Sequence, residues 1–351
     1  MGSSIVGWDV GGAHLKAALV VDGVITHVEQ YTCPLWKGTQ YLESAIKQIL
    51  DQLPFKKALH AVTMTGELVD CFKSRQEGVD EIIRTLQSCL PCHDLLIYAG
   101  NRGFISPADI IADDYLRIAS ANWLASASIA GYYLQDALFV DIGSTTTDIL
   151  VINQHQVDAQ GYTDYQRLVS GELLYTGAVR TPVIAVCQTA QFNGHTMGLM
   201  AEFFATMADV YRLTKELKPE HDQSETADGA DKSLAASVLR LSRLTGYEFS
   251  EHDWPVWLSF AEYIKEQQLD LIEEACLRQI ERLHDSSNKT LVAAGVGRFL
   301  IKQVAQRLNF DYVDFATLLS TSTQTTLDGS DCAPAVAVAM LASGLVNESA
   351  R

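Results

Sequence analysis

Basic residues are scarce in this chain of 351 residues. It has 26 Lys and Arg against 43 Asp and Glu, which gives a formal net charge of −17 at pH 7. Nucleic acids and anionic membrane surfaces are bound by clustered Lys and Arg, so the deficit argues against both as partners. It does not exclude a phosphorylated small molecule, because backbone amides and a metal ion can hold phosphate without a basic surface.

Long apolar runs and a cysteine framework are also missing. No apolar run reaches the roughly 18 residues that a membrane span needs, and the N-terminus lacks the charged-then-apolar design of a secretory signal. The seven cysteines are an odd number without framework spacing, which is typical of reduced thiols. The sequence therefore predicts a cytoplasmic protein with no membrane partner.

One strand–acid–turn–strand pattern occurs twice. An apolar strand that carries Asp9 runs into a turn and a second strand, and another that carries Asp141 does the same. The turn residues are Gly11 and Gly12 in the first copy and Gly143, Ser144, Thr145 and Thr146 in the second. Lys16 and Asp148 occupy equivalent positions just past each turn. The repetition predicts an internal duplication with two similar lobes.

The chemistry of this pattern favours a phosphate site with a metal ion. An acid at the end of a buried strand can hold Mg²⁺, so Asp9 and Asp141 are the predicted metal ligands. Glycines let backbone amides approach phosphate oxygens, and the hydroxyls of the second turn add donors. Lys16 could neutralise phosphate, and Asp148 could act as a general base. The pleat leaves open whether Lys16 and Asp148 face the site.

The remaining pattern alternates strands with amphipathic helices and predicts α/β layers. We expect a first lobe over 1–130, to which a C-terminal helix at about 331–351 could return. A second lobe is expected over 131–330, with a helical insertion at about 199–285. Single helices are expected over 113–129 and 199–213, and one or two over 257–283.

Three further segments are candidate parts of the site. Gly295 and Gly297 follow an apolar strand and could admit a nucleotide or other flat ligand, or simply form a tight turn. Glu172 and Arg180 lie near glycine turns, where they could line the site or belong to a structural loop. The acid-rich segment 221–231 could be a lid over a diphosphate–metal site or a solvated loop.

The duplicated acid–glycine hairpins resemble the superfamily of acetate and sugar kinases, heat-shock chaperones and actin. The resemblance implies an α/β fold of duplicated actin-like ATPase (ribonuclease H-like) lobes with a central cleft. It also implies that the two turns grip phosphates from opposite lobes and that the Gly295 turn faces adenosine. Within this superfamily the stretch DIGSTTTD at 141–148 is similar to the hydantoinase/oxoprolinase branch.

A narrower resemblance covers nearly the whole chain. The motifs that carry it are WDVGGA at 8–13, SANWL at 120–124, YTDYQR at 162–167, SGEL at 170–173, YTG at 175–177, RTP at 180–182, ETADG at 225–229 and CAPAV at 332–336. They look like the methanofuran-synthesis family, whose bacterial members are labelled tetrahydromethanopterin-linked one-carbon transfer proteins. The resemblance implies a transferase that joins an aminomethylfuran-methyl diphosphate to γ-glutamyltyramine, or a related phenol, and releases diphosphate.

Two other functions stay open at this point: an ATP-dependent small-molecule kinase or hydantoinase-like ATPase, and a non-enzymatic nucleotide-binding module. For the transferase we expect Mg²⁺ as cofactor, small-molecule diphosphate and phenolic substrates, and Asp148, Asp9 and Glu172, in that order, as candidates for the base. Binding of ATP and formation of a homo-oligomer stay open.

Overall fold

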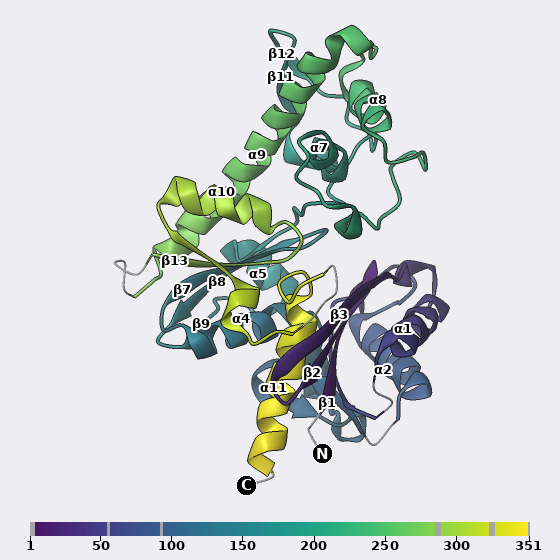
Figure 1. Ribbon diagram of the computed structural model, residues 1–351, viewed down its shortest axis with the longest axis vertical. Coiled ribbons are helices and arrows are strands. Elements are labelled where there is room, and N and C mark those ends of the chain that lie inside the picture. Colours follow the sequence, from purple (N-terminus) through teal and green to yellow (C-terminus); the bar gives the residue numbers. More distant parts are fainter. Residues whose placement is uncertain (1–3, 55–56, 92–93, 285–288, 323–326, 350–351) are drawn as a thin grey trace. The chain divides into compact units, whose positions relative to one another are not determined.

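The computed structural model describes residues 4–54, 57–91, 94–284, 289–322 and 327–349. The chain forms two compact units (Figure 1). Unit 1 is assembled from residues 1–137, 150–169 and 313–351, and unit 2 from residues 138–149 and 170–312.

The first sheet lies in unit 1 and has the strand order β3-β2-β1-β4-β5-β6. Its strands are β1 (Ser4–Val10), β2 (His14–Val21), β3 (Val24–Thr32), β4 (Leu59–Met64), β5 (Leu95–Tyr98) and β6 (Phe104–Ile105). Strands β1, β2 and β3 form an antiparallel meander, and β4 and β5 continue the sheet parallel to β1.

The second sheet repeats this order. It runs β10-β8-β7-β13-β14, with β9 paired to β8. Its strands are β7 (Ala137–Ile142), β8 (Thr147–Asn153), β9 (Gln156–Asp158), β10 (Leu173–Leu174), β13 (Thr290–Ala294) and β14 (Asp311–Asp314). As β1 pairs in parallel with β4, β7 pairs in parallel with β13, and as β2 pairs antiparallel with β3, β8 pairs antiparallel with β9. The predicted α/β fold of duplicated ribonuclease H-like sheets is confirmed.

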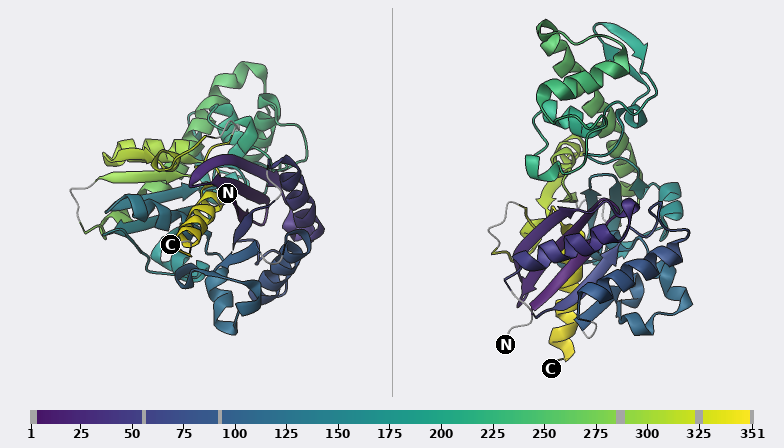
Figure 2. Two further views of the ribbon diagram at one scale, coloured as in Figure 1. Left: turned by 60° about the horizontal axis from the view of Figure 1, so that its bottom comes forward. Right: turned by 90° about the vertical axis from the view of Figure 1, so that its right-hand side faces the viewer.

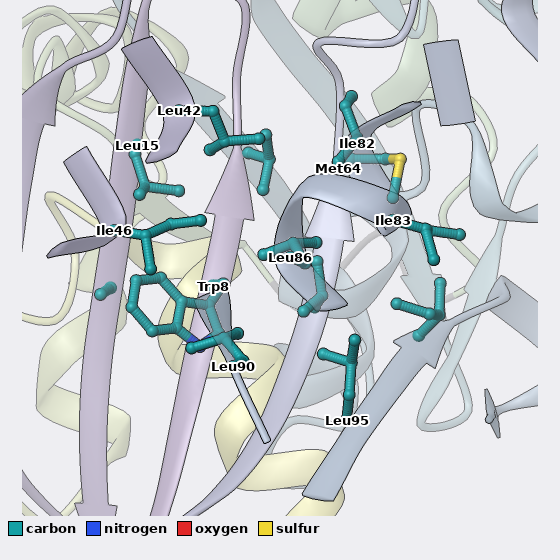
Figure 3. Close-up of a cluster of buried hydrophobic side chains, with 14 of the residues drawn as sticks. Trp8, Leu15, Leu42, Ile46, Met64, Ile82, Ile83, Leu86, Leu90 and Leu95 are labelled. Carbon is teal, nitrogen blue, oxygen red and sulfur yellow. The ribbon is translucent and has the colours of Figure 1, made fainter. Parts of the chain in front are cut away.

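Alternation along β1 assigns the two faces of the first sheet. Trp8 is buried in an apolar cluster with side chains of α1 (Gln40–Gln52) and α2 (Arg75–Cys89), among them Leu42, Ile46, Ile82 and Leu86 (Figure 3). Gly7 points to the other face, where α11 (Ala333–Ser349) packs against β1, β2 and β4. Figure 2 shows α11, in yellow, and the two helices α1 and α2 on opposite sides of the purple strands.

The absence of a side chain at Gly7 lets α11 pack closely against β1. A Cβ at residue 7 would overlap the carbonyl oxygen of Ala335 and come within 2.9 Å of Ala339. We expect Gly7→Ala to loosen α11 and to destabilise unit 1 by about 1–3 kcal/mol, the usual cost of overpacking. Hydrogen exchange of α11 peptides measures this, and Gly198→Ala, whose Cβ would meet nothing within 4 Å and whose φ is not left-handed, controls for the change from glycine to alanine itself. Unchanged protection of α11 in Gly7→Ala would contradict the packing role.

Two-residue turns set the register of three hairpins. Asp22–Gly23 and Gln154–His155 have positive φ at both residues, as a type I′ turn requires. The third, Asn193–Gly194, joins β11 (Thr189–Phe192) to β12 (His195–Gly198) and was not predicted, although Asn-Gly is a strong hairpin signal.

The helices differ from prediction in two places. The segment expected to be one helix over 113–129 is broken into α3 (Tyr115–Ile118) and α4 (Asn122–Tyr133), because Ser120 between them has φ +51°. The helix expected over 199–213 begins only at Met207 (α7, Met207–Leu213), where Thr206 and Asp209 form a capping box. The segment expected as one or two helices over 257–283 forms a single helix, α9 (Trp254–Ile280), which ends three residues earlier than expected.

The other α-helices are α5 (Asp164–Ser170), α6 (Val183–Val186), α8 (Leu234–Thr245) and α10 (Arg298–Leu308). No helix in the described part of the chain is both long and apolar enough to cross a membrane.

Candidate functional site

The two predicted turns have the same hydrogen-bonded geometry. In the first turn (residues 11–13, between β1 and β2) the Gly11 N–H donates to the His14 carbonyl at 3.0 Å. In the second turn (residues 143–146, between β7 and β8) the Gly143 N–H donates to the Thr146 carbonyl at 2.9 Å. The turns therefore repeat at the level of backbone structure as well as sequence.

Each turn is also backed by a glycine that follows the next parallel strand of its sheet. The Gly66 N–H, after β4, donates to the Val10 carbonyl at 3.0 Å, and the Gly297 N–H, after β13, donates to the Ile142 carbonyl at 2.8 Å. Because Val10 and Ile142 are the residues that directly follow Asp9 and Asp141, the two halves of the chain present one local design twice.

In unit 1, Lys16 lies directly opposite Asp9 in the antiparallel pair of β2 and β1. Residues opposite each other project to the same face, and by alternation this is the face of Gly7, toward α11. Near the start of that helix, burial raises the pKa of the Cys332 thiol; Lys16 acts to lower it, while Asp331 and Asp9 act to raise it. The structure thus gathers Asp9 and Lys16 at one point, with Asp331 nearby.

In unit 2 the second turn is held by the segment that carries the RTP motif. The N–H groups of Val179 and Arg180 donate to the Ser144 carbonyl at 3.1 and 2.8 Å. The Arg180 guanidinium lies 3.4 Å from the Thr145 hydroxyl, and burial lowers the pKa of Arg180 from its ordinary value. A fixed guanidinium beside two hydroxyls and a glycine is a suitable arrangement for phosphate oxygens. Arg180 therefore lines this turn.

The Gly295 turn lies against the second turn, within unit 2. Gly295 has φ +83°, and a Cβ there would overlap the carboxylate Oδ1 of Asp141 and the carbonyl oxygen of Ile142. A Cβ at Gly297 would overlap the Ile142 side chain. These glycines allow close packing of the turn on the Asp141 carboxylate; a contact with adenosine stays a prediction.

The predicted bases have different surroundings. Asp148 is half-buried on β8, opposite Leu173 of β10. Glu172 is fully buried, pairs with Arg282 at 2.9 Å and accepts a hydrogen bond from the Ser170 hydroxyl at 2.9 Å. Glu172 has no exposed surface through which a phenol could reach it, whereas Asp148 is partly exposed, so among the predicted bases this geometry favours Asp148 over Glu172.

Ion pairs fasten the acid-rich segment 221–231 to α7 and α8. Arg212 of α7 binds Asp222 through two nitrogens at 2.6 and 3.0 Å, and Asp228 accepts from Arg240 and Arg243 at 3.0 and 2.8 Å. Although burial acts to raise it, the hydrogen bonds of Arg243 and Arg240 lower the pKa of Asp228 to about 2. These acids serve a structural network; action of the segment as a lid stays a prediction.

Sequence reasoning missed a cluster of charged side chains beside the first turn. Glu67 follows Gly66 and is fully buried; the Ser120 hydroxyl lies 2.9 Å from it and 3.2 Å from Asp164. Arg75 pairs with Asp164 at 3.1 Å. Two of these residues fall within the SANWL and YTDYQR motifs, so the signal was present, but only the fold shows that the two motifs meet.

The fit of these residues to Mg²⁺ can be tested on their donor set. In the described part of the chain no three His, Cys, Asp or Glu side chains group as a metal site would require. Mg²⁺ beside phosphate takes one or two carboxylates, with phosphate oxygens and water completing its shell. Asp141 fits that role, because one carboxylate suffices and Asp141 lies near the end of β7, just before the turn whose hydroxyls and Arg180 guanidinium suit phosphate.

The family follows from a match over most of the chain. The model of the hydantoinase/oxoprolinase family matches residues 58–343. The chain belongs to this family. The predicted family membership is confirmed, and Asp141, the second turn, Arg180 and the Gly295 turn all lie within the matched part of this hydantoinase/oxoprolinase chain.

Two curated relatives share a more specific name. A protein of Methanocaldococcus jannaschii named (4-{4-[2-(gamma-L-glutamylamino)ethyl]phenoxymethyl}furan-2-yl)methanamine synthase is 29% identical over 307 residues, which are 87% of this chain and 89% of the relative. A protein of Methanococcus vannielii with the same name is 26% identical over 176 residues, 50% of this chain and 77% of the relative.

Among solved structures, this hydantoinase/oxoprolinase chain is similar to nucleotide-free acetone carboxylase. The TM-score is 0.50 at 9% identity, and the match covers 86% of this chain and 67% of that one. At this identity the likeness concerns the fold alone, and it agrees with the actin-like ATPase architecture.

Proposed function

We propose that this chain is a synthase of methanofuran-type cofactor biosynthesis, which condenses an aminomethylfuran-methyl diphosphate with γ-glutamyltyramine or a related phenol. In this reaction the bond from the furan-methyl carbon to diphosphate breaks, the aryl ether bond forms, and the phenol loses its proton. The observation that carries the proposal is the similarity to the Methanocaldococcus jannaschii synthase over 89% of its length.

The second turn supports the departure of diphosphate. The furan ring stabilises positive charge at the departing carbon, so the protein has mainly to stabilise the negative leaving group. Ser144, Thr145 and Arg180 place hydroxyls and a guanidinium at one turn, and Asp141 would hold Mg²⁺ beside it. When bound, Mg²⁺ would supply charge stabilisation to the leaving oxygens. No phosphoryl group is transferred, so a kinase-like fold can serve this reaction without ATP.

The experiment is an assay of both products. The chain is incubated with the furan-methyl diphosphate, γ-glutamyltyramine and Mg²⁺, diphosphate release is measured, and the ether is identified by mass spectrometry. We expect both products in equal amounts, and neither when the phenol is omitted. If no ether forms, and the chain instead converts ATP to ADP by hydrolysis or by transfer of a phosphoryl group to a small molecule, the kinase or ATPase alternative would replace the proposal.

A further inference from the structure

Glu67 is held at the first turn by two close backbone contacts. A Cβ on its neighbour Gly66 would lie 3.2 Å from the carbonyl carbon and oxygen of Gly11, and a Cβ on Gly78 of α2 would overlap the carbonyl oxygen of Glu67. The carboxyl group is fully buried in unit 1. A carboxyl buried this deeply needs partners, and the partners it has are unusual.

The Ser120 hydroxyl lies between two carboxyl groups. Its Oγ is 2.9 Å from Glu67 Oε1 and 3.2 Å from Asp164 Oδ2. A hydroxyl has one proton and cannot donate fully to both. When it donates to Asp164, the contact with Glu67 is a hydrogen bond only if Glu67 carries a proton and donates it to Ser120.

The backbone keeps Ser120 in this position. Ser120 has φ +51°, an uncommon conformation for a residue other than glycine, and Ala119 before it forms a parallel bridge to Met64 at the end of β4. Strained residues of this kind are often found at functional sites. Here the strain ends the helical stretch and aims the hydroxyl between the two acids.

Arg75 distinguishes the two acids. Its guanidinium donates to Asp164 at 3.1 Å but lies 3.7 Å from Glu67 without a hydrogen bond. Glu67 Oε2 and Arg75 Nε are both buried atoms that have no hydrogen-bond partner among the described residues. The cation thus neutralises the partly exposed Asp164, and an added proton is better accommodated on the desolvated Glu67.

We propose that Asp164, Ser120 and Glu67 form a proton relay beside the first turn, which takes the proton of a hydroxyl substrate at Asp164 and stores it on Glu67. For the identity of that substrate, a phenol, the inference rests on the proposed function. The phenol O–H bond breaks as its oxygen bonds to the furan-methyl carbon. The phenol proton passes to Asp164 Oδ2, and Asp164 then gives a proton to the Ser120 oxygen. Ser120 in turn gives its own hydroxyl proton to Glu67 Oε1, so Asp164 and Ser120 return to their starting states.

The acidity of Glu67 agrees with storage near neutral pH. Burial raises the pKa of Glu67 to about 7; the Ser120 hydrogen bond and Arg75 act to lower it, and Asp164 acts to raise it. Glu67 must be ionised to receive a proton. The rate of ether formation should therefore rise as the pH increases through about 7 and level off above it.

The first test needs no substrate. The chain is labelled with [5-¹³C]glutamate, and the Glu67 signal is identified by its loss in Glu67→Gln. We expect it to titrate near pH 7 in the wild type and at lower pH in Asp164→Asn, because the Asp164 charge raises the pKa of Glu67. A Glu67 signal that titrates near the ordinary 4.5 in the wild type overturns the relay, whatever the chain's activity.

The second test separates transfer from structure. At pH 8 we expect Ser120→Ala, Asp164→Asn and Glu67→Gln to lower kcat about 10- to 100-fold with KM little changed, and Glu67→Gln to abolish the inflection near pH 7. Ser126→Ala on α4 and Asp80→Asn on α2 are matched controls outside the cluster and should keep the wild-type kcat. A wild-type kcat in Ser120→Ala would overturn the relay, and absence of ether synthesis in the wild type would overturn only the proposed function.

Discussion

Asp141→Asn is expected to reduce ether synthesis by at least about 100-fold, because it removes the charge that would hold Mg²⁺ beside the leaving diphosphate. The fold should persist, since Asn has the size of Asp and Gly295 accommodates either side chain. The measurements are kcat for diphosphate release, with circular dichroism to verify the fold. Removal of divalent cations with EDTA should have the same effect on the wild type, and added Mg²⁺ should reverse it.

Asp158→Asn is the matched control for this prediction. Asp158 is an exposed acid on β9 of the same sheet and accepts a hydrogen bond from Asn153. We expect its variant to retain the wild-type kcat. If Asp141→Asn also retains full activity, Asp141 holds no metal ion that the reaction needs.

Arg240→Met is expected to cause the largest loss of stability, about 3–5 kcal/mol, which is typical when one partner of a buried ion pair is removed. The Arg240 side chain is fully buried and donates to Asp209 at 2.7 Å, to Asp228 at 3.0 Å and to the Asp231 carbonyl at 3.1 Å. Methionine fills part of the volume but leaves these oxygens with fewer donors. Hydrogen exchange of α7 and α8 peptides in increasing urea measures the loss locally.

Arg243→Met provides the comparison. Arg243 is a neighbour on α8 that binds the same Asp228 at 2.8 Å, but its side chain is 45% exposed. Exposed pairs contribute about 0–1 kcal/mol, so this variant should unfold close to the wild type. Equal effects of the two substitutions would show that burial of Arg240 does not determine the stability of this network.

The duplication could be predicted from the sequence because its signals are local. An acid, a glycine turn and an apolar strand on each side are adjacent in the chain. The Asp22–Gly23 turn follows from residue type, whereas Gln154–His155 adopts the same turn without that signal. The position of Lys16 opposite Asp9 could not be predicted, because a single bulge between the glycines and Lys16 would have reversed its face.

The rest of the candidate site depends on contacts between distant residues. Glu67, Ser120 and Asp164 are far apart in sequence, and none of them has a local pattern that indicates proton transfer. The break in the helix at Ser120 also depends on a contact between distant residues. The sequence of this segment predicts a helix, whereas the bridge from Ala119 to Met64 of β4 accounts for the left-handed conformation of Ser120. Arg180 was noted near a glycine turn, but its contact with Thr145 required the fold.

The order in which the chain becomes native follows from how its units are assembled. Unit 2 is nearly continuous in sequence, whereas unit 1 needs α11, which packs on β1, a strand synthesised long before that helix. During translation, the face of β1 that carries Gly7 therefore stays without its partner α11 until more than three hundred further residues have emerged from the ribosome. Chaperones that shield apolar strands during translation should consequently engage the first sheet of this protein for longer than the second.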